Sequence, residues 1–387
     1  MEVKRIIQVF LLLLVCSIII VYIMFSSNDE FKSTTPTIVQ NIGNNMQSVI
    51  KNLTKHIKEK AKEVKDKAIN IEEKALDIKE KALDKIATTS DYIDDKKPHP
   101  LIVLFTTFGS NTTEIKIYNT IREWASLRPL VQPVLYFTDN RTHATALQRG
   151  WEAIRCPKIA DRISPSCVLP AMFLDAEERF PNADFYGYAN GDLLFDDSLV
   201  NTLKSVKESL VSSKLLIIGC RFNYQMNGRE LILNAQNVTS RKSKAYQFTG
   251  YAIDYFITPR QKYVWKSLPP LVVGRTLYDN YMIAFSVKKN IPVLDTTKTI
   301  LALHQTTSTN FESRKGKKDH GINGRVITGS WKIEFDLGRV GCSHFVTSHS
   351  NGTVVMKKRE KLICAKSYEK EHINIDDVRN MTVFKNL

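Results

Sequence analysis

The chain has 387 residues, of which 43% are hydrophobic and 25% are charged, and its formal net charge is +15. This composition is ordinary for a globular protein, and the length allows one large domain with accessory segments. The sequence contains no Cys-x-x-Cys pair, no P-loop and no Gly-x-Gly-x-x-Gly stretch, which argues against a zinc ribbon and against two common phosphate-binding loops.

Residues 6–25 form an uncharged, mostly apolar run that follows Lys4 and Arg5. Twenty helical residues span about 30 Å, the thickness of the hydrocarbon core of a bilayer. The basic flank is N-terminal, so the positive-inside rule puts residues 1–5 in the cytosol and the rest of the chain across the membrane. A cleaved signal peptide is the alternative, but its apolar core would be shorter and would end at a small-x-small site. We therefore expect an uncleaved signal anchor, as in a single-pass type II membrane protein.

Two further features favour a body in the lumen of the endoplasmic reticulum or Golgi. Cys156 with Cys167 and Cys342 with Cys364 are plausible disulfides in an oxidising compartment, which leaves Cys220 as a buried small hydrophobe. Acceptor sequons for N-glycosylation are spread beyond the apolar run. They lie at Asn52, Asn111, Asn140, Asn237, Asn351 and Asn380.

The positive charge belongs mainly to the body, because acids nearly balance bases in the segment that precedes it. Nucleic acid is the usual partner of such a charge. In a lumenal body, the phosphates of a nucleotide sugar or an acidic glycan fit better, and we expect no nucleic-acid partner.

Residues 26–97 are predicted to form a stem whose middle, about residues 50–86, is helical. A heptad seam of alternating four- and three-residue spacings runs through it, with Lys and Glu on its flanks. A coiled coil that pairs two protomers and a solitary charged helix both fit, since alanines bury little area, and the long unbroken register favours the homodimer. The helix should end before Pro98 and Pro100. The seam consists of Ile57, Ala61, Val64, Ala68, Ile71, Ala75, Ile78 and Ala82.

The body, residues 98–340, alternates apolar strands with amphipathic helices and is followed by a C-terminal extension, residues 341–387, that is polar and resists assignment. This alternation predicts an α/β domain with a mostly parallel sheet. Strands are expected at residues 101–107, 131–139, 151–156, 185–188 and 215–222, and helices at 114–127, 142–149, 168–180, 197–211 and 278–288.

Polar side chains follow three of these strands, where ligands of open α/β sheets bind. Thr106 and Thr107 end the first strand, and Asp139 ends the second. Asn190, Gly191 and Asp192 follow the fourth in the stretch YANGDLLF. Asn-Gly is also a strong hairpin signal, so a plain surface turn is the alternative to a site in which Asp192 binds a divalent cation, Gly191 lets the backbone turn and Asn190 contacts a sugar or ribose.

The body resembles lumenal glycosyltransferases of the GT-A fold, a Rossmann-like fold of the nucleotide-diphospho-sugar transferase superfamily. The matching stretches cover roughly residues 100–306 and are LFTTF, NTIREWASL, PVLYFTD, YGYANGDLLF, VVGRTLYDNYMI and ALHQ. In that family an Asp-x-Asp-like motif binds the metal of a UDP-sugar, and Asn-Gly-Asp departs from it by lacking the first acid. The resemblance implies Mn²⁺ or Mg²⁺ at Asp192.

The resemblance also implies roles for later residues. His304 would be a second metal ligand, although a lone histidine is more often structural. Asp279 would contact the acceptor or act as base in an inverting transfer, with Asn280 beside it at the start of a helix, where a helix N-cap is the equal alternative.

Two more contributions are less specific. Arg314 and Lys315 would close over the diphosphate unless their loop is simply solvated. Asp254 is a further candidate for the cleft, or else a turn residue at a strand end.

These observations predict a glycosyltransferase that moves a sugar from a nucleotide-diphosphate donor, UDP-linked, to a glycan or glycoprotein. The alternative is a catalytically inactive lumenal scaffold or lectin-like binder of the same fold. A hydrolase fits less well, because no paired carboxylates and no Ser-His-Asp order stand out.

Overall fold

The computed structural model describes residues 59–60, 99–109, 112–160, 165–212, 214–260, 263–306, 321–328, 335–364, 378 and 380–385. The chain divides into two compact units, Met1–Lys96 and Lys97–Leu387, and all elements below belong to the second. The predicted anchor, nearly all of the stem, Arg314 and Lys315 lie outside the described residues. Within the described part, no helix is both long and apolar enough to cross a membrane.

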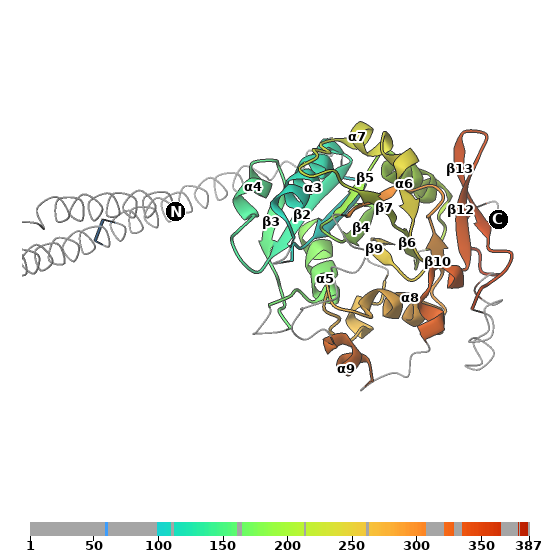
Figure 1. Cartoon of the computed structure of the whole chain (residues 1–387). Coiled ribbons are helices and arrows are strands. Elements are labelled where there is room, and N and C mark those ends of the chain that lie inside the picture. The colour runs from blue at the N-terminus through green and yellow to red at the C-terminus, as the bar shows by residue number, and fades with distance from the viewer. Residues whose placement is uncertain are drawn as a thin grey trace, which may run out of the picture. The chain divides into compact units, whose positions relative to one another are not determined.

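A nine-stranded sheet forms the centre of this unit (Figure 1). Its strand order is β13-β12-β10-β6-β9-β4-β1-β2-β3, and most neighbours are parallel, whereas β9 is antiparallel to both of its neighbours and β13 is antiparallel to β12. The strands are β1 (Ile102–Thr106), β2 (Val131–Phe137), β3 (Glu152–Arg155), β4 (Phe185–Ala189), β6 (Leu216–Cys220), β9 (Ile253–Pro259), β10 (Val293–Asp295), β12 (Phe345–Ser350) and β13 (Thr353–Lys358).

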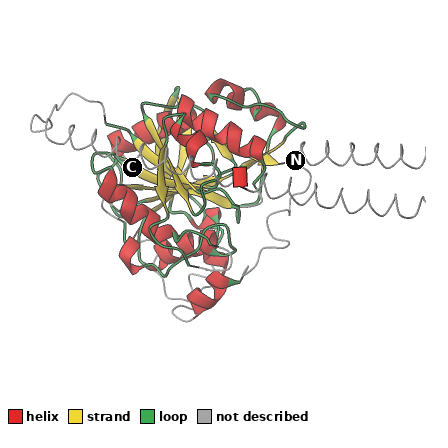
Figure 2. Cartoon of the chain, turned by 90° about the vertical axis from the view of Figure 1, so that its left-hand side faces the viewer, coloured by secondary structure: helices red, strands yellow, loops and turns green. Residues whose placement is uncertain are grey.

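Helices cover both faces of this sheet, as Figure 2 shows. Every residue of β1, β4 and β6 is buried, which explains why these strands have continuous apolar sequences. Alternate strand residues pack on α5 (Leu169–Arg179) and α8 (Tyr278–Lys288) on one face, and on α3 (Glu114–Ser126) and α6 (Ser198–Ser209) on the other. The predicted α/β class with a mostly parallel sheet is confirmed.

A second, four-stranded sheet has the order β5-β11-β7-β8. Its strands are β5 (Leu193–Phe195), β7 (Phe222–Gln225), β8 (Tyr246–Gln247) and β11 (Ala302–Thr306). Strand β5 directly follows β4, and β7 directly follows β6, so the small sheet extends from the carboxyl ends of central strands. The remaining helices are α4 (His143–Leu147), α7 (Ala235–Thr239), α9 (Ile322–Thr328) and the 3₁₀ turns η1 (Lys242–Lys244), η2 (Trp265–Ser267), η3 (Phe335–Gly338) and η4 (Val340–Cys342).

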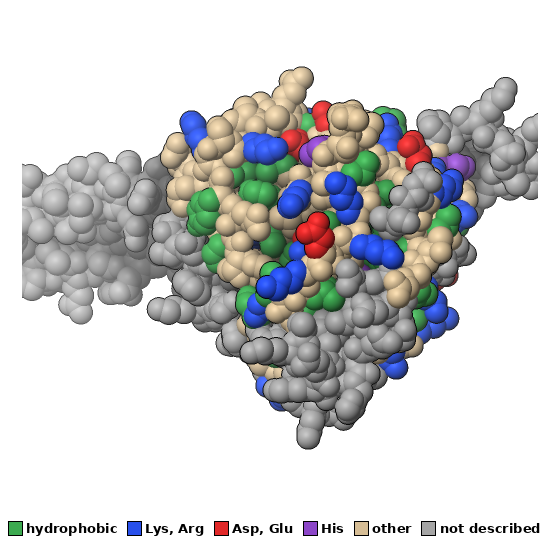
Figure 3. Space-filling model, turned by 90° about the vertical axis from the view of Figure 1, so that its right-hand side faces the viewer, with side chains coloured by type: hydrophobic (Ala, Val, Ile, Leu, Met, Phe, Trp, Pro, Cys, Tyr) green, Lys and Arg blue, Asp and Glu red, His purple; other side chains and the backbone are tan. Residues whose placement is uncertain are grey.

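The C-terminal extension contributes a hairpin to the large sheet. Strands β12 and β13 meet at the Asn351-Gly352 turn, where both residues have positive φ. On the side of the molecule on which this hairpin lies, basic side chains outnumber acidic ones (Figure 3). The extension is therefore part of the domain, and the expectation that the positive charge resides in the body agrees with this surface.

Both predicted disulfides are present. Cys156 pairs with Cys167 and Cys342 pairs with Cys364, each with Cα atoms 5.5 Å apart. Cys220 is free and buried, as expected. Cys342–Cys364 joins the end of η4 to the segment that follows β13, so it fastens the C-terminal hairpin to the domain.

Candidate functional site

The Asn190-Gly191-Asp192 turn joins two different sheets. Strand β4 before it belongs to the large sheet, and β5 after it pairs with β11 in the small sheet. The plain hairpin alternative is therefore wrong, although Leu193 N does donate to Asn190 O at 3.0 Å to form a tight turn. The turn lies at the same edge as the ends of β1 and β2, because these three strands run parallel.

The backbone of this turn is held by bonds from outside it. Thr120 Oγ1 donates to the Gly191 carbonyl at 2.9 Å, and Gln305 N donates to the Asp192 carbonyl at 3.1 Å. The indole of Trp124 donates to the Leu193 carbonyl at 3.0 Å. Three successive carbonyls are thus fixed by α3 and β11, which limits how far Asp192 can move.

Gly191 is required by close packing against the end of β1. A Cβ at this position would lie 2.7 Å from the Phe108 ring and 3.0 Å from the Thr107 carbonyl. We expect Gly191→Ala to lower the free energy of unfolding by about 1–3 kcal/mol, because the ring must move out of its packed position. Gly250→Ala is the matched control, since a Cβ there meets nothing within 4 Å. Equal denaturant midpoints for the two variants would show that Phe108 does not constrain the turn.

Asp192 and His304 meet at the centre of the site. Asp192 Oδ2 lies 3.1 Å from His304 Nε2, and the Asp192 side chain keeps 28% of its surface exposed. The other ring nitrogen of His304 lies 3.1 Å from Thr306 Oγ1. Burial works to raise the pKa of Asp192, but His304, followed by Lys116 and Arg221, outweighs it and holds that pKa well below its ordinary value. Asp192 is therefore an anion throughout the physiological range.

This pair has the donor chemistry and spacing of two metal ligands. Each bond of an octahedral Mg²⁺ to oxygen is about 2.1 Å, so two adjacent ligands lie about 3 Å apart, close to the observed separation. Across the described ranges, no group of three or more His, Cys, Asp or Glu side chains could hold a metal. A cation at Asp192 and His304 would thus need further oxygens from water and substrate phosphate, as Mg²⁺ sites commonly do.

Asn190 is a linker between three elements. Its Oδ1 accepts from Tyr188 Oη at 3.0 Å and from Tyr278 Oη at 2.9 Å, and its Nδ2 donates to Asp254 Oδ1 at 2.7 Å. Burial raises the pKa of both tyrosines, so both keep the proton that they donate. Three of the four hydrogen-bonding positions of Asn190 are thus used inside the protein, which leaves little for the predicted sugar contact.

Asp254 lies near the start of β9, buried and paired, rather than in a turn. Its Oδ2 lies 2.7 Å from Arg221 Nη1, and its side chain is 9% exposed. The same carboxylate therefore binds Asn190 with one oxygen and Arg221 with the other. Asp254 positions these two residues, and its two oxygens are already occupied.

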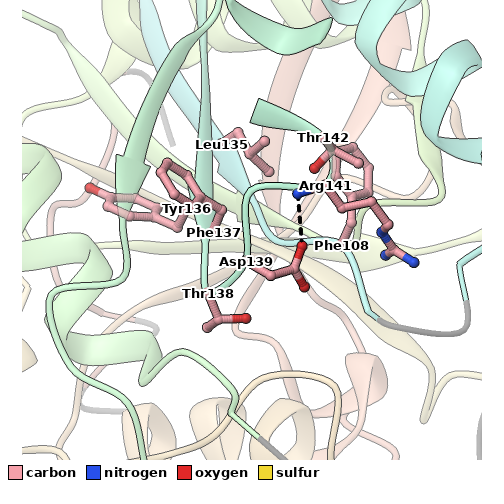
Figure 4. A pocket seen from close by; sticks show the side chains of 8 residues that line it. All are labelled: Phe108, Leu135, Tyr136, Phe137, Thr138, Asp139, Arg141 and Thr142. Atoms are coloured by element: carbon pink, nitrogen blue, oxygen red, sulfur yellow. Dashed lines mark hydrogen bonds between the residues drawn. The ribbon is translucent and has the colours of Figure 1, made fainter. Parts of the chain in front are cut away.

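The threonines and Asp139 lie at the neighbouring strand ends. Thr106 is fully buried, so its predicted contact with a ligand is not possible, whereas Thr107 is half-buried. Asp139 lines a pocket after β2, where its Oδ1 accepts from Arg141 N at 3.0 Å (Figure 4). Phe108 lines this pocket and also contacts Gly191, so the pocket adjoins the Asp192 turn.

Helix α8 begins beside the turn because Tyr278, its first residue, binds Asn190. Asp279 lies in the first helical turn, half-buried, and the N-cap position is taken by Leu277, whose φ of 75° is left-handed. The N-cap alternative for Asp279 is thus wrong. Asn280 is buried, and its Nδ2 donates to the carbonyls of Tyr251 and Gly338, so the structure gives it a structural role in place of the predicted acceptor contact.

Several residues that complete the site have no recognisable motif. Arg221 and Lys116 supply positive charge near Asp192, and Tyr188 and Tyr278 hold Asn190. Arg221 directly follows the apolar strand β6, and a basic residue at such a strand end is the one signal that would have singled it out. Lys116 lies on a helix face, where its sequence gives no such indication.

Comparisons with known proteins give only distant likenesses. No protein-family profile and no curated protein matches the chain. Among solved structures, the mannosyl-3-phosphoglycerate synthase of Rubrobacter xylanophilus is 14% identical with a TM-score of 0.36, covering 67% of this chain and 86% of its own. The mannose-1-phosphate geranyltransferase of Thermus thermophilus is 10% identical with a TM-score of 0.23, covering 72% and 97%.

A cytidylyltransferase of Leptospira borgpetersenii is 14% identical with a TM-score of 0.24, over 42% of this chain, and the chain spans 61% of that structure. Two of these three proteins are transferases by name. All three TM-scores are below 0.5, so these likenesses assign no function to the chain.

Proposed function

We propose that this chain is a glycosyltransferase that moves a sugar from a UDP-linked donor to a glycan or glycoprotein acceptor. The observation that carries the proposal is the contact between Asp192 and His304, which come from separate segments and lie 3.1 Å apart at the ligand-binding edge of an α/β sheet. The positive charges of Arg221 and Lys116 beside this pair favour a polyanionic ligand such as a diphosphate.

In this proposal Asp192 and His304 hold Mn²⁺ or Mg²⁺. The cation would act as a Lewis acid on the departing diphosphate. The fixed carbonyls of the turn keep Asp192 in place, and the network of Asn190, Tyr188 and Tyr278 ties the turn to α8. Arg314 and Lys315 would add positive charge over the diphosphate, and Asp139 and Thr107 would contact the nucleotide from the adjoining strand ends.

Asp279 is the base that we propose for an inverting transfer. It is one residue from Tyr278, which binds Asn190, and this proximity supports a position beside the reacting centre. A retaining transfer would need no separate base, so the stereochemistry of the product decides whether Asp279 has this role.

We further propose that residues 6–25 anchor the protein in the Golgi or endoplasmic reticulum as a single-pass type II protein with a lumenal catalytic domain. The two disulfides support an oxidising compartment. A homodimer through the stem remains a proposal that the heptad seam supports.

Binding of UDP to the purified full-length protein tests the proposed function. We expect titration calorimetry to give tighter binding of UDP with Mn²⁺ than with a chelator, because Asp192 and His304 would hold a cation whose charge attracts the diphosphate. UMP, which lacks the second phosphate, is the control ligand and should gain less from Mn²⁺. A folded protein with a cooperative melting transition that binds UDP in neither condition would contradict the transferase and favour the lumenal scaffold.

A further inference from the structure

Arg221 presents hydrogen-bond donors that no acceptor in the described part of the chain uses. Its Nη1 binds Asp254, and its guanidinium carbon lies 4.8 Å from the centre of the Phe248 ring. Its Nε is buried and has no acceptor among the described residues. A guanidinium offers Nε and Nη2 together as a planar fork for an oxyanion. Because Nη1 is fixed on Asp254, this second edge is oriented, and no described residue fills it.

Asn223 presents an unused acceptor two residues further along the same strand face. Its side chain is 1% exposed, and its Nδ2 donates to Tyr246 Oη at 3.3 Å. Its Oδ1 is buried with no donor among the described residues. An unpaired buried polar atom costs about 1–3 kcal/mol, so two of them close together call for a partner, and none of the described residues supplies one.

These two orphan atoms adjoin the Asp192–His304 pair. Arg221 directly precedes β7, and its carbonyl accepts from Phe248 N, which extends the pairing of β7 with β8. Residues two apart on a strand point to the same face, so Arg221 and Asn223 share one. Asn223 is the register partner of His304 on β11, which puts His304 on that face as well.

The charge of Arg221 and the free acceptor of Asn223 together indicate the chemistry of the ligand. Asp254 neutralises Arg221 through one edge of the guanidinium, but the other edge still favours a charged acceptor, because hydrogen bonds between ions are about twice as strong as neutral ones. The free acceptor of Asn223 requires a donor such as a hydroxyl. An oxyanion and a hydroxyl occur together on a sugar diphosphate and on an anionic sugar.

We propose that Arg221 and Asn223 form a subsite for an anionic saccharide, in which the Nε–Nη2 edge of Arg221 binds an oxyanion and Asn223 Oδ1 accepts a sugar hydroxyl. The oxyanion is either the diphosphate of the donor or a carboxylate of the acceptor, and this inference rests on the proposed function for the identity of the ligand. Arg221 is then a substrate-binding residue, and Asp254 positions it.

The test compares Arg221→Lys with the wild-type protein in three titrations, with UDP and Mn²⁺, with glucuronate, and with glucose as the neutral sugar. Lysine keeps the charge opposite Asp254 but has no planar second edge. Arg359→Lys is the matched control, because Arg359 is also a partly buried arginine paired with an aspartate, Asp295. Melting curves of both variants show whether each is folded.

We expect Arg221→Lys to weaken binding of UDP or of glucuronate about tenfold or more, as loss of a bidentate ionic contact should, with no effect of Arg359→Lys. Loss confined to UDP assigns the oxyanion to the donor, and loss confined to glucuronate assigns it to the acceptor. Wild-type affinity of a folded Arg221→Lys variant for both ligands would overturn the subsite and leave the proposed function intact. A third outcome would be that the wild type binds glucuronate but not UDP, and that Arg221→Lys abolishes the binding of glucuronate. This outcome would contradict the proposed function and leave the subsite intact.

Asn223→Asp is the second variant, since it keeps the shape of the side chain and adds a negative charge beside the proposed oxyanion. We expect it to weaken the same ligand that Arg221→Lys weakens, by repulsion. A variant that weakened a different ligand, or glucose alone, would separate the two residues and overturn a shared subsite.

Discussion

Replacing Asp192 by asparagine is expected to abolish the Mn²⁺-dependent part of UDP binding, with a loss in affinity on the order of 100-fold or more. Loss of residues that only support a metal ligand already costs about 10–100-fold in metal affinity, and Asp192 is the carboxylate ligand itself in the proposed site. Asparagine has the same shape and can still contact His304, so the fold should persist. Asp192→Asn therefore changes the charge of the ligand while leaving the turn in place.

The measurement is calorimetric titration of UDP with and without Mn²⁺, on the variant and the wild type side by side. Asp184→Asn is the control, because Asp184 is also paired with a basic residue, Lys207, with its side chain 35% exposed. Asp184→Asn should bind as the wild type does. If Asp192→Asn retained the full response to Mn²⁺, Asp192 would not be a metal ligand. The contact between Asp192 and His304 would then no longer support the proposed function.

We expect the Glu123→Gln variant to become more stable relative to the wild-type protein as pH rises, measured as the difference between their free energies of unfolding. Glu123 is fully buried in α3, where its Oε2 accepts from Phe195 N at 3.0 Å and its Oε1 has no partner among the described residues. Burial, opposed by that backbone bond and helped by Asp196 and Asp197, raises the pKa of Glu123 well above its ordinary value. The folded protein therefore keeps a proton that the unfolded chain has lost.

The sign follows from proton linkage. Between the unfolded pKa of about 4.5 and the raised folded pKa, the folded state binds more protons, so wild-type stability falls as pH rises, by up to about 1.4 kcal/mol per pH unit. Below pH 4.5 this stability is fully present, and above the folded pKa its loss is complete. Glutamine does not titrate and still offers an oxygen to Phe195 N, so Glu123→Gln should escape this loss.

Urea unfolding of both proteins from pH 4.5 to pH 9 gives the difference in free energy of unfolding directly. Exposed Glu208, on α6, provides the control, and Glu208→Gln should show no such trend. A difference between Glu123→Gln and wild type that stays constant across this range would mean that Glu123 ionises equally in the folded and unfolded states.

The central strands were predictable because strands buried on both faces have continuous apolar sequences, and the main helices were predictable from their amphipathic spacing. Strand β1 was expected at residues 101–107 and is Ile102–Thr106, and helix α8 was expected at its observed bounds. The meeting of the strand ends after β1, β2 and β4 also followed from parallel order alone. Both disulfides had been expected as plausible pairs in an oxidising compartment, and the structure contains them.

The antiparallel direction of β9 and the C-terminal hairpin were not predicted. Strand direction depends on which partner a strand finds, and β9 pairs between β4 and β6, which are distant in sequence. The β12–β13 hairpin has an Asn-Gly turn, but its apolar residues are few, because β13 is an edge strand whose side chains are mostly exposed or half-buried. Such a strand lacks the apolar run by which β1 was found.

The sequence by itself determined the class of the fold, its buried strands and the position of Asp192 at a strand end, since these depend on local hydrophobic pattern and on turn chemistry. Only the tertiary structure decided what surrounds Asp192. His304 reaches it through the pairing of β11 with β5, and Arg221 comes near it from the end of β6. The same packing buried Thr106 and Asn280 and turned Asn190 into a linker. Contacts between residues tens to more than a hundred positions apart depend on sheet order and packing, which no local pattern encodes.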